Sequence, residues 1–299
     1  MRAISAFRLL RPKQWAKGFL IFAALLFTRS YTDPERVRLS LLAFAAMCLV
    51  SSAVYVFNDL QDVTRDQNHP VKKHRPLASG AVSVPVGLSL GVLCLASGIA
   101  IAVQLGGPSL ALIGVYLGIQ AGYNLGLKHI AVLDVFLVSS GFVLRAALGA
   151  AAIQVTISGW LLLCTGALAL LLGFAKRRHE FVLQGDARSS SRESLESYTR
   201  EALDALVIIA ASVSAICYGL YALESPTAYR YPGLFGTTAF VFYGIARYTF
   251  LAFSKGEVGE PESVVLGDPH MVLAIFGFLV TAALALSGYS IPFVEVGRP

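Results

Sequence analysis

Charged residues are scarce in this chain of 299 residues. Aspartate, glutamate, lysine and arginine together make up only 14% of it, whereas about a quarter is typical of soluble proteins. Hydrophobic residues account for 56%. This balance excludes an ordinary water-soluble globular protein, and nothing in the chain suggests nucleic-acid binding.

Several sequence patterns of other protein classes are also absent. The short alternating strands of a membrane β-barrel are missing. No Ser-His-Asp or Cys-His arrangement and no phosphate-binding P-loop is visible. No small-residue cleavage site follows a short apolar core near the N-terminus, so we expect no removable signal peptide. The four cysteines form no C-x-x-C pair and lie in apolar runs, which indicates packing residues rather than disulfides or metal ligands.

Apolar runs near the length that crosses a bilayer, about 17–25 residues, recur along the whole chain. They predict an all-α, polytopic membrane protein that forms one transmembrane domain over residues 1–299. The nine expected spans are about 18–29 (extending back to Trp15), 39–57, 82–104, 108–122, 131–150, 157–175, 202–222, 232–253 and 270–292. Small residues suited to helix interfaces occur almost everywhere, so the sequence leaves open whether the chain is a homo-oligomer.

The basic residues predict the orientation in the membrane. With the N-terminus inside the cell, the inner segments are 1–17, 58–81, 123–130, 176–201 and 254–269. They hold 17 lysines and arginines, against 5 in the outer segments. Because positive residues accumulate in cytoplasmic loops, we expect a cytoplasmic N-terminus and a cytoplasmic working face. A channel or exchanger would instead spread polar groups through its depth, or break short helices at matching places in two halves.

The most informative stretch, Asn58 to Asp66, reads Asn-Asp-Leu-Gln-Asp-Val-Thr-Arg-Asp and follows directly on an apolar run. On a helix with about 100° per residue, Asn58, Asp62 and Asp66 are displaced by only about 40° each. Asp59 lies in the same quarter of the surface. Like charges at this spacing repel, and hard cations such as Mg²⁺ bind such oxygens together with substrate phosphates. The stretch predicts a Mg²⁺–diphosphate site at the end of a membrane helix; the alternative is a solvated acidic turn.

Basic residues follow this acidic stretch in the sequence. Lys72, Lys73 and Arg75 bring positive charge back toward it, and a metal site flanked by cations suits a phosphorylated ligand. Positive-inside topology alone is the alternative explanation for each of them. Arg75 is the strongest candidate, because Pro76 and Gly80 constrain the backbone around it.

Two ionisable residues lie inside one predicted span. Asp134 stands a few residues into it, where a charge is costly, so we expect it to face the helix bundle with Lys128 or a bound cation as its partner. Arg145 lies deeper in the same span. A functional role and a structural pair with a polar group on a neighbouring helix are equal alternatives for it.

These features resemble the UbiA superfamily of intramembrane prenyltransferases. The likeness lies in the nine spans, the Asn-Asp-x-x-Asp-x-x-x-Asp motif after the second, and the Tyr-x-x-x-x-Lys segment Tyr123–Lys128 after the fourth. It covers nearly the whole chain and implies a nine-helix bundle around a central cavity, with two aspartate-rich motifs for Mg²⁺ and a prenyl diphosphate. The chain departs from the pattern at the second motif, where Lys176-Arg177-Arg178-His179-Glu180 stands in place of Asp-x-x-x-Asp.

This departure resembles one branch of the superfamily, the decaprenyl-phosphate phosphoribosyltransferases. The residues that carry the resemblance are Leu10 to Lys17, the Asn58–Asp66 motif, Leu127-Lys128 through Asp134-Val135 to Gly141-Phe142 and Arg145, the Lys176-Arg177 pair, and Ser194 to Tyr198. Members of the branch use 5-phosphoribosyl 1-diphosphate (PRPP) as donor and a polyprenyl (decaprenyl) phosphate as acceptor. The resemblance implies a Mg²⁺-dependent pentosyltransferase of the cell (inner) membrane that makes a precursor of cell-wall arabinan.

The resemblance also implies roles for individual residues. Asn58, Asp59, Asp62 and Asp66 would hold Mg²⁺ and the donor diphosphate, with Asp59 and Asp62 as the catalytic residues. The candidates for contacts with the phosphates of donor and acceptor are Lys17, Arg75, Tyr123, Lys128, Lys176 and Arg177. The polyprenyl chain is expected to enter the cavity sideways from the lipid.

Two other functions are open at this point. An ordinary UbiA-type prenyltransferase would move a prenyl group from a prenyl diphosphate to a small aromatic acceptor, but half of its diphosphate clamp is missing here. A non-catalytic lipid-binding protein or transporter would tolerate the loss of Asp62, whereas a Mg²⁺ enzyme would lose several orders of magnitude in rate.

Overall fold

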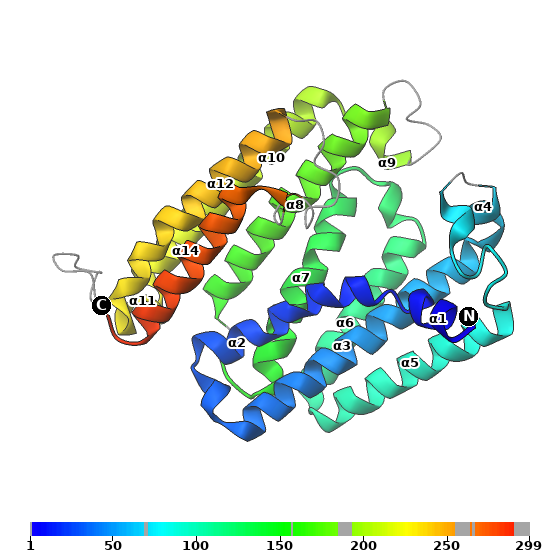
Figure 1. Cartoon of the computed structure of the whole chain (residues 1–299), viewed down its shortest axis with the longest axis horizontal. Helices are drawn as coiled ribbons and strands as arrows, with labels where there is room; N and C mark the ends of the chain where they lie inside the picture. Colours follow the sequence, from blue (N-terminus) through cyan, green and yellow to red (C-terminus); the bar gives the residue numbers. More distant parts are fainter. Residues whose placement is uncertain are drawn as a thin grey trace. The chain divides into compact units, whose positions relative to one another are not determined.

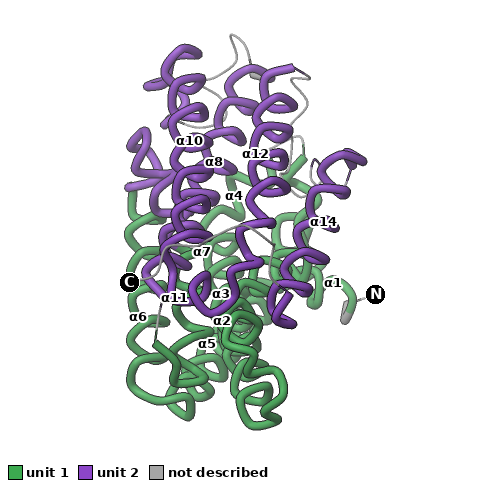
Figure 2. The backbone as a smooth tube through the Cα atoms, turned by 90° about the vertical axis from the view of Figure 1, so that its left-hand side faces the viewer, with its two compact units in different colours: residues 1–126, 141–157 green, residues 127–140, 158–299 purple. Residues whose placement is uncertain are grey.

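The computed structural model describes residues 2–68, 71–156, 158–184, 193–254, 264 and 267–289. Within these residues every regular element is a helix, as predicted (Figure 1). The chain divides into two compact units, drawn in two colours in Figure 2. Unit 1 comprises residues 1–126 and 141–157, and unit 2 comprises residues 127–140 and 158–299. Each unit has a buried hydrophobic core of its own.

Unit 1 is built around the long helix α3, which packs along α5 (Figure 1). Its elements are α1 (Arg2–Leu9), the 3₁₀ helix η1 (Pro12–Ile21), α2 (Phe22–Phe27), η2 (Ser30–Thr32), α3 (Pro34–Gln61), α4 (Val63–Gln67), η3 (Lys72–His74), α5 (Val84–Gln104) and α6 (Gly107–Asn124). Helix α3 has a well-formed start, because Asp33 accepts hydrogen bonds from the N–H groups of Glu35 and Arg36 and Pro34 takes the first helical position.

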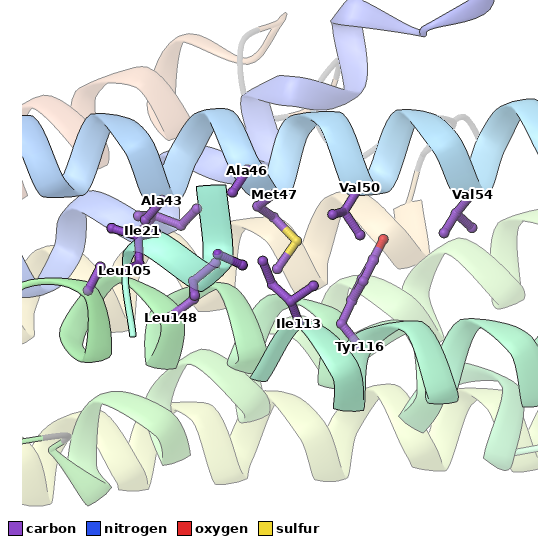
Figure 3. Close-up of a cluster of buried hydrophobic side chains, with 12 residues drawn as sticks. Ile21, Ala43, Ala46, Met47, Val50, Val54, Leu105, Ile113, Tyr116 and Leu148 are labelled. Carbon is purple, nitrogen blue, oxygen red and sulfur yellow. The ribbon is translucent and has the colours of Figure 1, made fainter. Parts of the chain in front are cut away.

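The core of unit 1 lies between α3, α6 and the part of α7 (Leu133–Ala152) that belongs to this unit. Met47 of α3 faces Ile113 and Tyr116 of α6 in a cluster of buried apolar side chains (Figure 3). The segment before α3 packs closely as well, since a side chain on Gly149 would collide with the backbone carbonyl of Ile21. Small residues that allow such close approach are the usual means of packing helices in membranes.

Unit 2 begins with η4 (Leu127–His129) and the first turns of α7. It continues with α8 (Gly159–Gln184), α9 (Glu193–Glu196), α10 (Arg200–Glu224), α11 (Pro226–Arg230), η6 (Pro232–Gly236), α12 (Thr237–Ser254) and α14 (Pro269–Leu286). Helix α8 packs along α10, and α12 packs along α14 (Figure 1). Asp268 caps the start of α14 by accepting a hydrogen bond from the N–H of Met271.

Among the described residues, six helices are long and apolar enough to cross a membrane: α3, α5, α7, α8, α10 and α14. They match six of the nine predicted spans. The other three predicted spans correspond to η1 with α2, which is broken, and to α6 and α12, which are as long as α14 but less apolar. The count of nine remains a prediction. Residues 69–70, 185–192, 255–263 and 265–266 of the predicted inner segments lie outside the described residues.

Two predicted boundaries differ from the structure. The first span is not one continuous α-helix but the 3₁₀ helix η1 followed by the short α2. It lies against α3, where the Trp15 indole donates to the Ser52 hydroxyl at 3.0 Å and a Cβ on Gly18 would stand 2.8 Å from the Phe44 ring. In addition, α8 continues to Gln184, so Lys176 to Glu180 lie on a helix rather than in a loop.

Candidate active site

The acidic stretch of unit 1 lies where α3 passes into α4. Helix α3 ends at Gln61, Asp62 is its C-cap residue, and α4 begins at Val63. Helical spacing is nevertheless kept, because the Asp62 N–H donates to the Asn58 carbonyl at 3.0 Å and the Asp66 N–H donates to the Asp62 carbonyl at 2.8 Å. The backbone therefore places Asn58, Asp62 and Asp66 one turn apart, as their spacing predicted.

Two carboxylates of this stretch are buried and held by arginines. Asp59 is 3% exposed and Asp66 is 2% exposed. Arg75 Nη1 bridges them, at 3.1 Å from Asp59 Oδ1 and 2.6 Å from Asp66 Oδ2. Arg11 Nη2 donates to the same Asp59 oxygen at 2.5 Å, and its guanidinium lies 4.8 Å from the centre of the Tyr55 ring. We call Arg11, Asp59, Asp66 and Arg75 the acidic network.

Arg11 is the member of this network that sequence reasoning missed. The sequence places it among the basic residues that set the orientation and in the stretch Leu10 to Lys17 that carries the family resemblance, but does not mark it as a site residue. Its partner Asp59 is 48 residues away, a separation at which no periodic pattern reports contact. Arg11 also adopts a left-handed backbone conformation, with φ of 53°, which is uncommon for a residue other than glycine. The one signal in the sequence is its position directly before Pro12 at the entrance to the first apolar run.

The donor atoms of the stretch suit Mg²⁺, but arginines hold two of the carboxylates. Among the described residues, no three or more His, Cys, Asp or Glu side chains gather as they would around a metal ion. Mg²⁺ is usually bound through one or two carboxylates, with waters and substrate phosphates completing its shell. The residues therefore suit a cation that binds together with a diphosphate better than a cation coordinated by protein groups alone. The Mg²⁺ site remains a prediction.

The other predicted phosphate contacts of unit 1 lie on separate segments. Lys17 lies in η1, with its Nζ 6.0 Å from the centre of the Phe142 ring. Tyr123 lies in the last turn of α6 and is half-buried. Next to the acidic network, burial and the neighbouring charge of Arg75 lower the pKa of Lys72. Positive charge thus follows the acidic stretch in space as it does in sequence.

Arg145 is buried in α7, and its partners support the structural alternative. Its Nη1 donates to the Gly141 carbonyl of its own helix at 2.7 Å. Its guanidinium also lies 5.3 Å from the centre of the Tyr116 ring on the neighbouring α6. A ring face attracts a guanidinium electrostatically, so Arg145 is stabilised within unit 1 by a helix carbonyl and an aromatic face.

Unit 2 has a second group of charges, centred on Asp134, which has no exposed surface. Its Oδ2 accepts from Arg177 Nε at 2.6 Å, and its Oδ1 accepts from the Tyr198 hydroxyl at 3.2 Å. Arg177 Nη1 also donates to Glu180 Oε2 at 2.6 Å. The expectation that Asp134 has a partner is confirmed, but the partner is Arg177 and not Lys128. We call Asp134, Arg177, Glu180 and Tyr198 the Asp134 cluster.

The remaining cations of unit 2 take different positions. Lys128 lies in η4 and Lys176 lies on α8, both half-buried. Arg178 is buried and ties α8 to two neighbours, because its Nε donates to Asp204 at 2.5 Å and its Nη1 donates to the Ala252 carbonyl at 2.7 Å. The end of α8 therefore places cations among carboxylates of unit 2.

The model of the UbiA prenyltransferase family matches residues 18–256. The chain belongs to the UbiA prenyltransferase family. With six helices able to span a bilayer in the part of the chain that the structure describes, this UbiA-family enzyme is a multi-pass membrane protein and a transferase.

Relatives and solved structures agree with that assignment. The chain is 34% identical over 289 residues to "Decaprenyl-phosphate phosphoribosyltransferase" of Mycobacterium tuberculosis, with 93% of each chain covered. It is 33% identical over 290 residues to the protein of the same name from Mycolicibacterium smegmatis, covering 92% of this chain and 90% of that one. The structure of a UbiA homolog from Archaeoglobus fulgidus bound to GPP and Mg²⁺ superposes with a TM-score of 0.69, at 18% identity and over 95% of this chain and 98% of that one. The last comparison establishes the UbiA fold.

The predicted site residues of this UbiA-family chain fall into two sets. Unit 1 contains Lys17, Asn58, Asp59, Asp62, Asp66, Arg75 and Tyr123, and unit 2 contains Lys128, Lys176 and Arg177. Within unit 1 the structure brings Asp59, Asp66 and Arg75 into direct contact. Within unit 2 it joins Arg177 to Asp134 and Glu180, two residues that were not among the predicted site residues.

Proposed function

We propose that this enzyme transfers 5-phosphoribose from PRPP to a polyprenyl phosphate and releases diphosphate. The observation that carries the proposal is the similarity, over at least nine-tenths of both chains, to two proteins named Decaprenyl-phosphate phosphoribosyltransferase. The end of α8 favours the same reaction, because Lys176 to Glu180 offer cations where a typical prenyltransferase has a second pair of aspartates. A protein with one acidic motif and added cations suits a donor and an acceptor that are both phosphorylated.

The proposed reaction requires the protein mainly to position the two substrates and to neutralise their negative charge. An oxygen of the acceptor phosphate attacks C1 of the ribose, and the bond from C1 to the diphosphate oxygen breaks. The acceptor is already anionic, so no strong general base is required. Positive charge that develops at C1 in the transition state would be stabilised by a nearby carboxylate, and Asp59 and Asp62 are the proposed catalytic residues.

The acidic stretch is the proposed place for the donor diphosphate. Asn58, Asp59, Asp62 and Asp66 would hold Mg²⁺ together with the diphosphate, and the bound cation would offset negative charge on the leaving group. Arg75 would then exchange its contacts with Asp59 and Asp66 for diphosphate oxygens. Such an exchange is feasible because Arg75 keeps 29% of its side-chain surface exposed.

Five further side chains are proposed to contact the phosphates of donor and acceptor. They are Lys17 and Tyr123 in unit 1 and Lys128, Lys176 and Arg177 in unit 2. Lysine and arginine suit this role because charge-assisted hydrogen bonds to phosphate are short and strong. Truncation of a single contact residue is expected to raise the KM for one substrate more than it lowers kcat.

The proposed setting is the cell (inner) membrane, with nine spans and a single catalytic domain. The distribution of lysine and arginine supports a cytoplasmic N-terminus, which places the Asn58–Asp66 stretch and residues 176–184 on the cytoplasmic side. Reporter fusions after Gln67, after Gln184 and after Arg230 test this orientation: the first two are expected inside the cell and the third outside. The opposite pattern would reverse the assignment.

A label-transfer assay tests the reaction. Purified protein in detergent is mixed with ribose-labelled PRPP, decaprenyl phosphate and Mg²⁺. Label is expected in the organic phase only when protein, acceptor and metal are all present, and EDTA is expected to abolish the transfer. With PRPP labelled in its diphosphate, the label is expected to remain in the aqueous phase.

The rival reactions give different results in the same experiment. An ordinary prenyltransferase would leave ribose label in the aqueous phase and would turn over a prenyl diphosphate with a small aromatic acid. A folded protein that turns over neither pair of substrates would support a non-catalytic role in lipid binding or transport.

A further inference from the structure

The turn that leads into α7 has an unfavourable backbone conformation, which contacts with the rest of the protein must stabilise. Val132 has a φ of 68°, and the Leu133 N–H donates to the Ala131 carbonyl across it at 2.8 Å. This is a γ-turn with a left-handed central residue, a form that is rare and strained. A β-branched residue with positive φ is a true outlier, which persists only where surrounding contacts hold it.

One of the contacts that hold this turn comes from Tyr198. Its hydroxyl accepts a hydrogen bond from the Val132 N–H at 2.5 Å and donates one to Asp134 Oδ1 at 3.2 Å. Tyr198 is 66 residues from Val132 in the sequence. One hydroxyl group therefore links the strained turn to the buried carboxylate at the start of α7.

The ring of Tyr198 is fixed by packing. It is buried in a cluster with Phe181 of α8, Leu195 of α9 and Leu203 of α10, and Ala131 packs against the same cluster. Helix α9 also lies against η4. A side chain held on several sides in this way has little freedom, so its hydroxyl acts as a fixed point for the turn.

The hydroxyl also has the protonation state that this arrangement requires. Burial raises the pKa of Tyr198 to about 12, so the group keeps its proton at physiological pH and can donate to Asp134. Asp134 in turn orients Arg177 through its other oxygen. Three segments of unit 2 thus meet at Asp134: the turn after η4, the end of α8 and the stretch after α9.

We infer that Tyr198 is a positioning residue of the transferase. Its hydroxyl holds the Ala131–Leu133 turn to Asp134, and we call this pair of hydrogen bonds the latch. The latch keeps Arg177 and the adjoining η4, which contains Lys128, in position for phosphate binding. The substrate in this inference rests on the proposed function, whereas the latch itself does not. Loss of the hydroxyl would leave the Val132 N–H without this acceptor and would remove one of the two groups that orient Asp134.

The test compares Tyr198→Phe with a matched control. Tyr229→Phe removes a hydroxyl that also donates to a carboxylate, Glu224, at 2.9 Å, but on an exposed part of unit 2. Tyr198→Phe is expected to raise the KM for PRPP or for the polyprenyl phosphate about tenfold, the cost of one or two lost hydrogen bonds, at nearly unchanged kcat. The control is expected to leave both constants at wild-type values. A purely structural tyrosine would lower the melting temperature and the active fraction without changing KM.

Amide hydrogen exchange tests the latch without using activity. In Tyr198→Phe the Val132 amide is expected to exchange faster than in the wild type, while the amides of α10 stay protected. Equal exchange at Val132 in the two proteins would overturn the latch. If the wild-type protein fails to transfer label from PRPP, the proposed function fails, but the exchange result still decides whether the latch exists.

A second variant tests whether Tyr198 acts through the turn. Val132→Gly removes the cost of the positive φ, because glycine adopts this region readily. In the Tyr198→Phe background it is expected to recover part of the lost affinity, so that the two substitutions are not additive. Full additivity of the two effects on KM would contradict a shared mechanism.

Discussion

The acidic network of unit 1 and the Asp134 cluster of unit 2 use the same chemistry with different exposure. In both, a buried carboxylate is held by arginine. In unit 1 Asp59 and Asp66 are buried, while Arg11 and Arg75 each keep 29% of their side-chain surface exposed. In unit 2 both partners are buried, with Arg177 at 6% and Asp134 at 0%. A half-exposed arginine can leave its carboxylate for a ligand at modest cost, whereas a fully buried one cannot.

This contrast assigns different tasks to the two regions. The acidic network suits a binding site, because its cations can move aside when a metal and a diphosphate arrive. The Asp134 cluster suits a fixed support that holds Arg177 in place for its proposed phosphate contact, because separating the Arg177 and Asp134 charges would leave one of them buried alone. Variants of the two regions should therefore separate loss of activity from loss of stability.

The largest effect is expected for Asp62→Asn in unit 1. The change keeps the shape of the side chain but removes one negative charge from the proposed Mg²⁺–diphosphate site. Label transfer is expected to fall by about 10³-fold, as for the loss of a group that stabilises developing charge, with little change in melting temperature. Asp33→Asn is the matched control, because Asp33 caps the far end of the same helix and asparagine is an equally good cap. Transfer within about tenfold of the wild type would count against the acidic stretch as the site.

The next effect is a difference in stability between the two regions. Asp134→Asn leaves the buried Arg177 with weaker compensation, and breaking a buried pair typically costs about 3 kcal/mol. Arg11→Gln leaves Asp59 with Arg75 as its partner and is expected to cost about 1 kcal/mol or less. Denaturation in detergent, followed by circular dichroism, measures both changes. Equal losses in the two variants would remove the contrast between a movable and a fixed cluster.

Chemical modification gives a smaller but more local comparison. Phenylglyoxal reacts with accessible guanidinium groups, so Arg11 and Arg75 are expected to react several times faster than Arg177. Mg²⁺ with diphosphate is expected to protect Arg75, and to leave the slow reaction of Arg177 unchanged. Peptide mapping by mass spectrometry reads each site separately. Protection by Mg²⁺ alone, without diphosphate, would favour a metal site made by protein groups only.

The smallest effect concerns a third pair, Arg247 and Asp268, at the start of α14. Hydrogen bonds from Arg247 lower the pKa of Asp268 to about 2, from an ordinary value of 3.8. Because the folded-state value is depressed, the stabilisation is present above about pH 4 and is lost as the pH falls toward 2. Melting temperature measured across this range is expected to fall less steeply in Asp268→Asn than in the wild type. Parallel curves for the two proteins would mean that this pair contributes nothing measurable.

Local sequence patterns were enough to predict much of the fold. Hydropathy located the long helices, and the helical period placed Asn58, Asp62 and Asp66 one turn apart, where the backbone keeps them. Each of these features depends on neighbours within a few residues, and such features can be read from one sequence.

Tertiary partners could not be predicted in the same way. The pair Arg177 and Asp134 is separated by 43 residues, and Tyr198 and Asp134 by 64. An unpaired charge inside the membrane is costly, which indicated that Asp134 needs a partner. The sequence offers several cations as that partner, and their spacing does not distinguish among them. The γ-turn at Val132 was also beyond prediction, since valine is among the residues least suited to it.

Titration of diphosphate into the purified wild-type protein, with and without Mg²⁺, tests most directly whether the acidic stretch is the diphosphate site. Calorimetry is expected to show binding when both Mg²⁺ and diphosphate are present, and no binding of diphosphate in EDTA. The same titration of Asp62→Asn is expected to show strongly weakened binding, while Asp33→Asn binds as the wild type does. Equal affinity in Asp62→Asn and the wild type, or binding that is unchanged by EDTA, would contradict a Mg²⁺–diphosphate site at the end of α3.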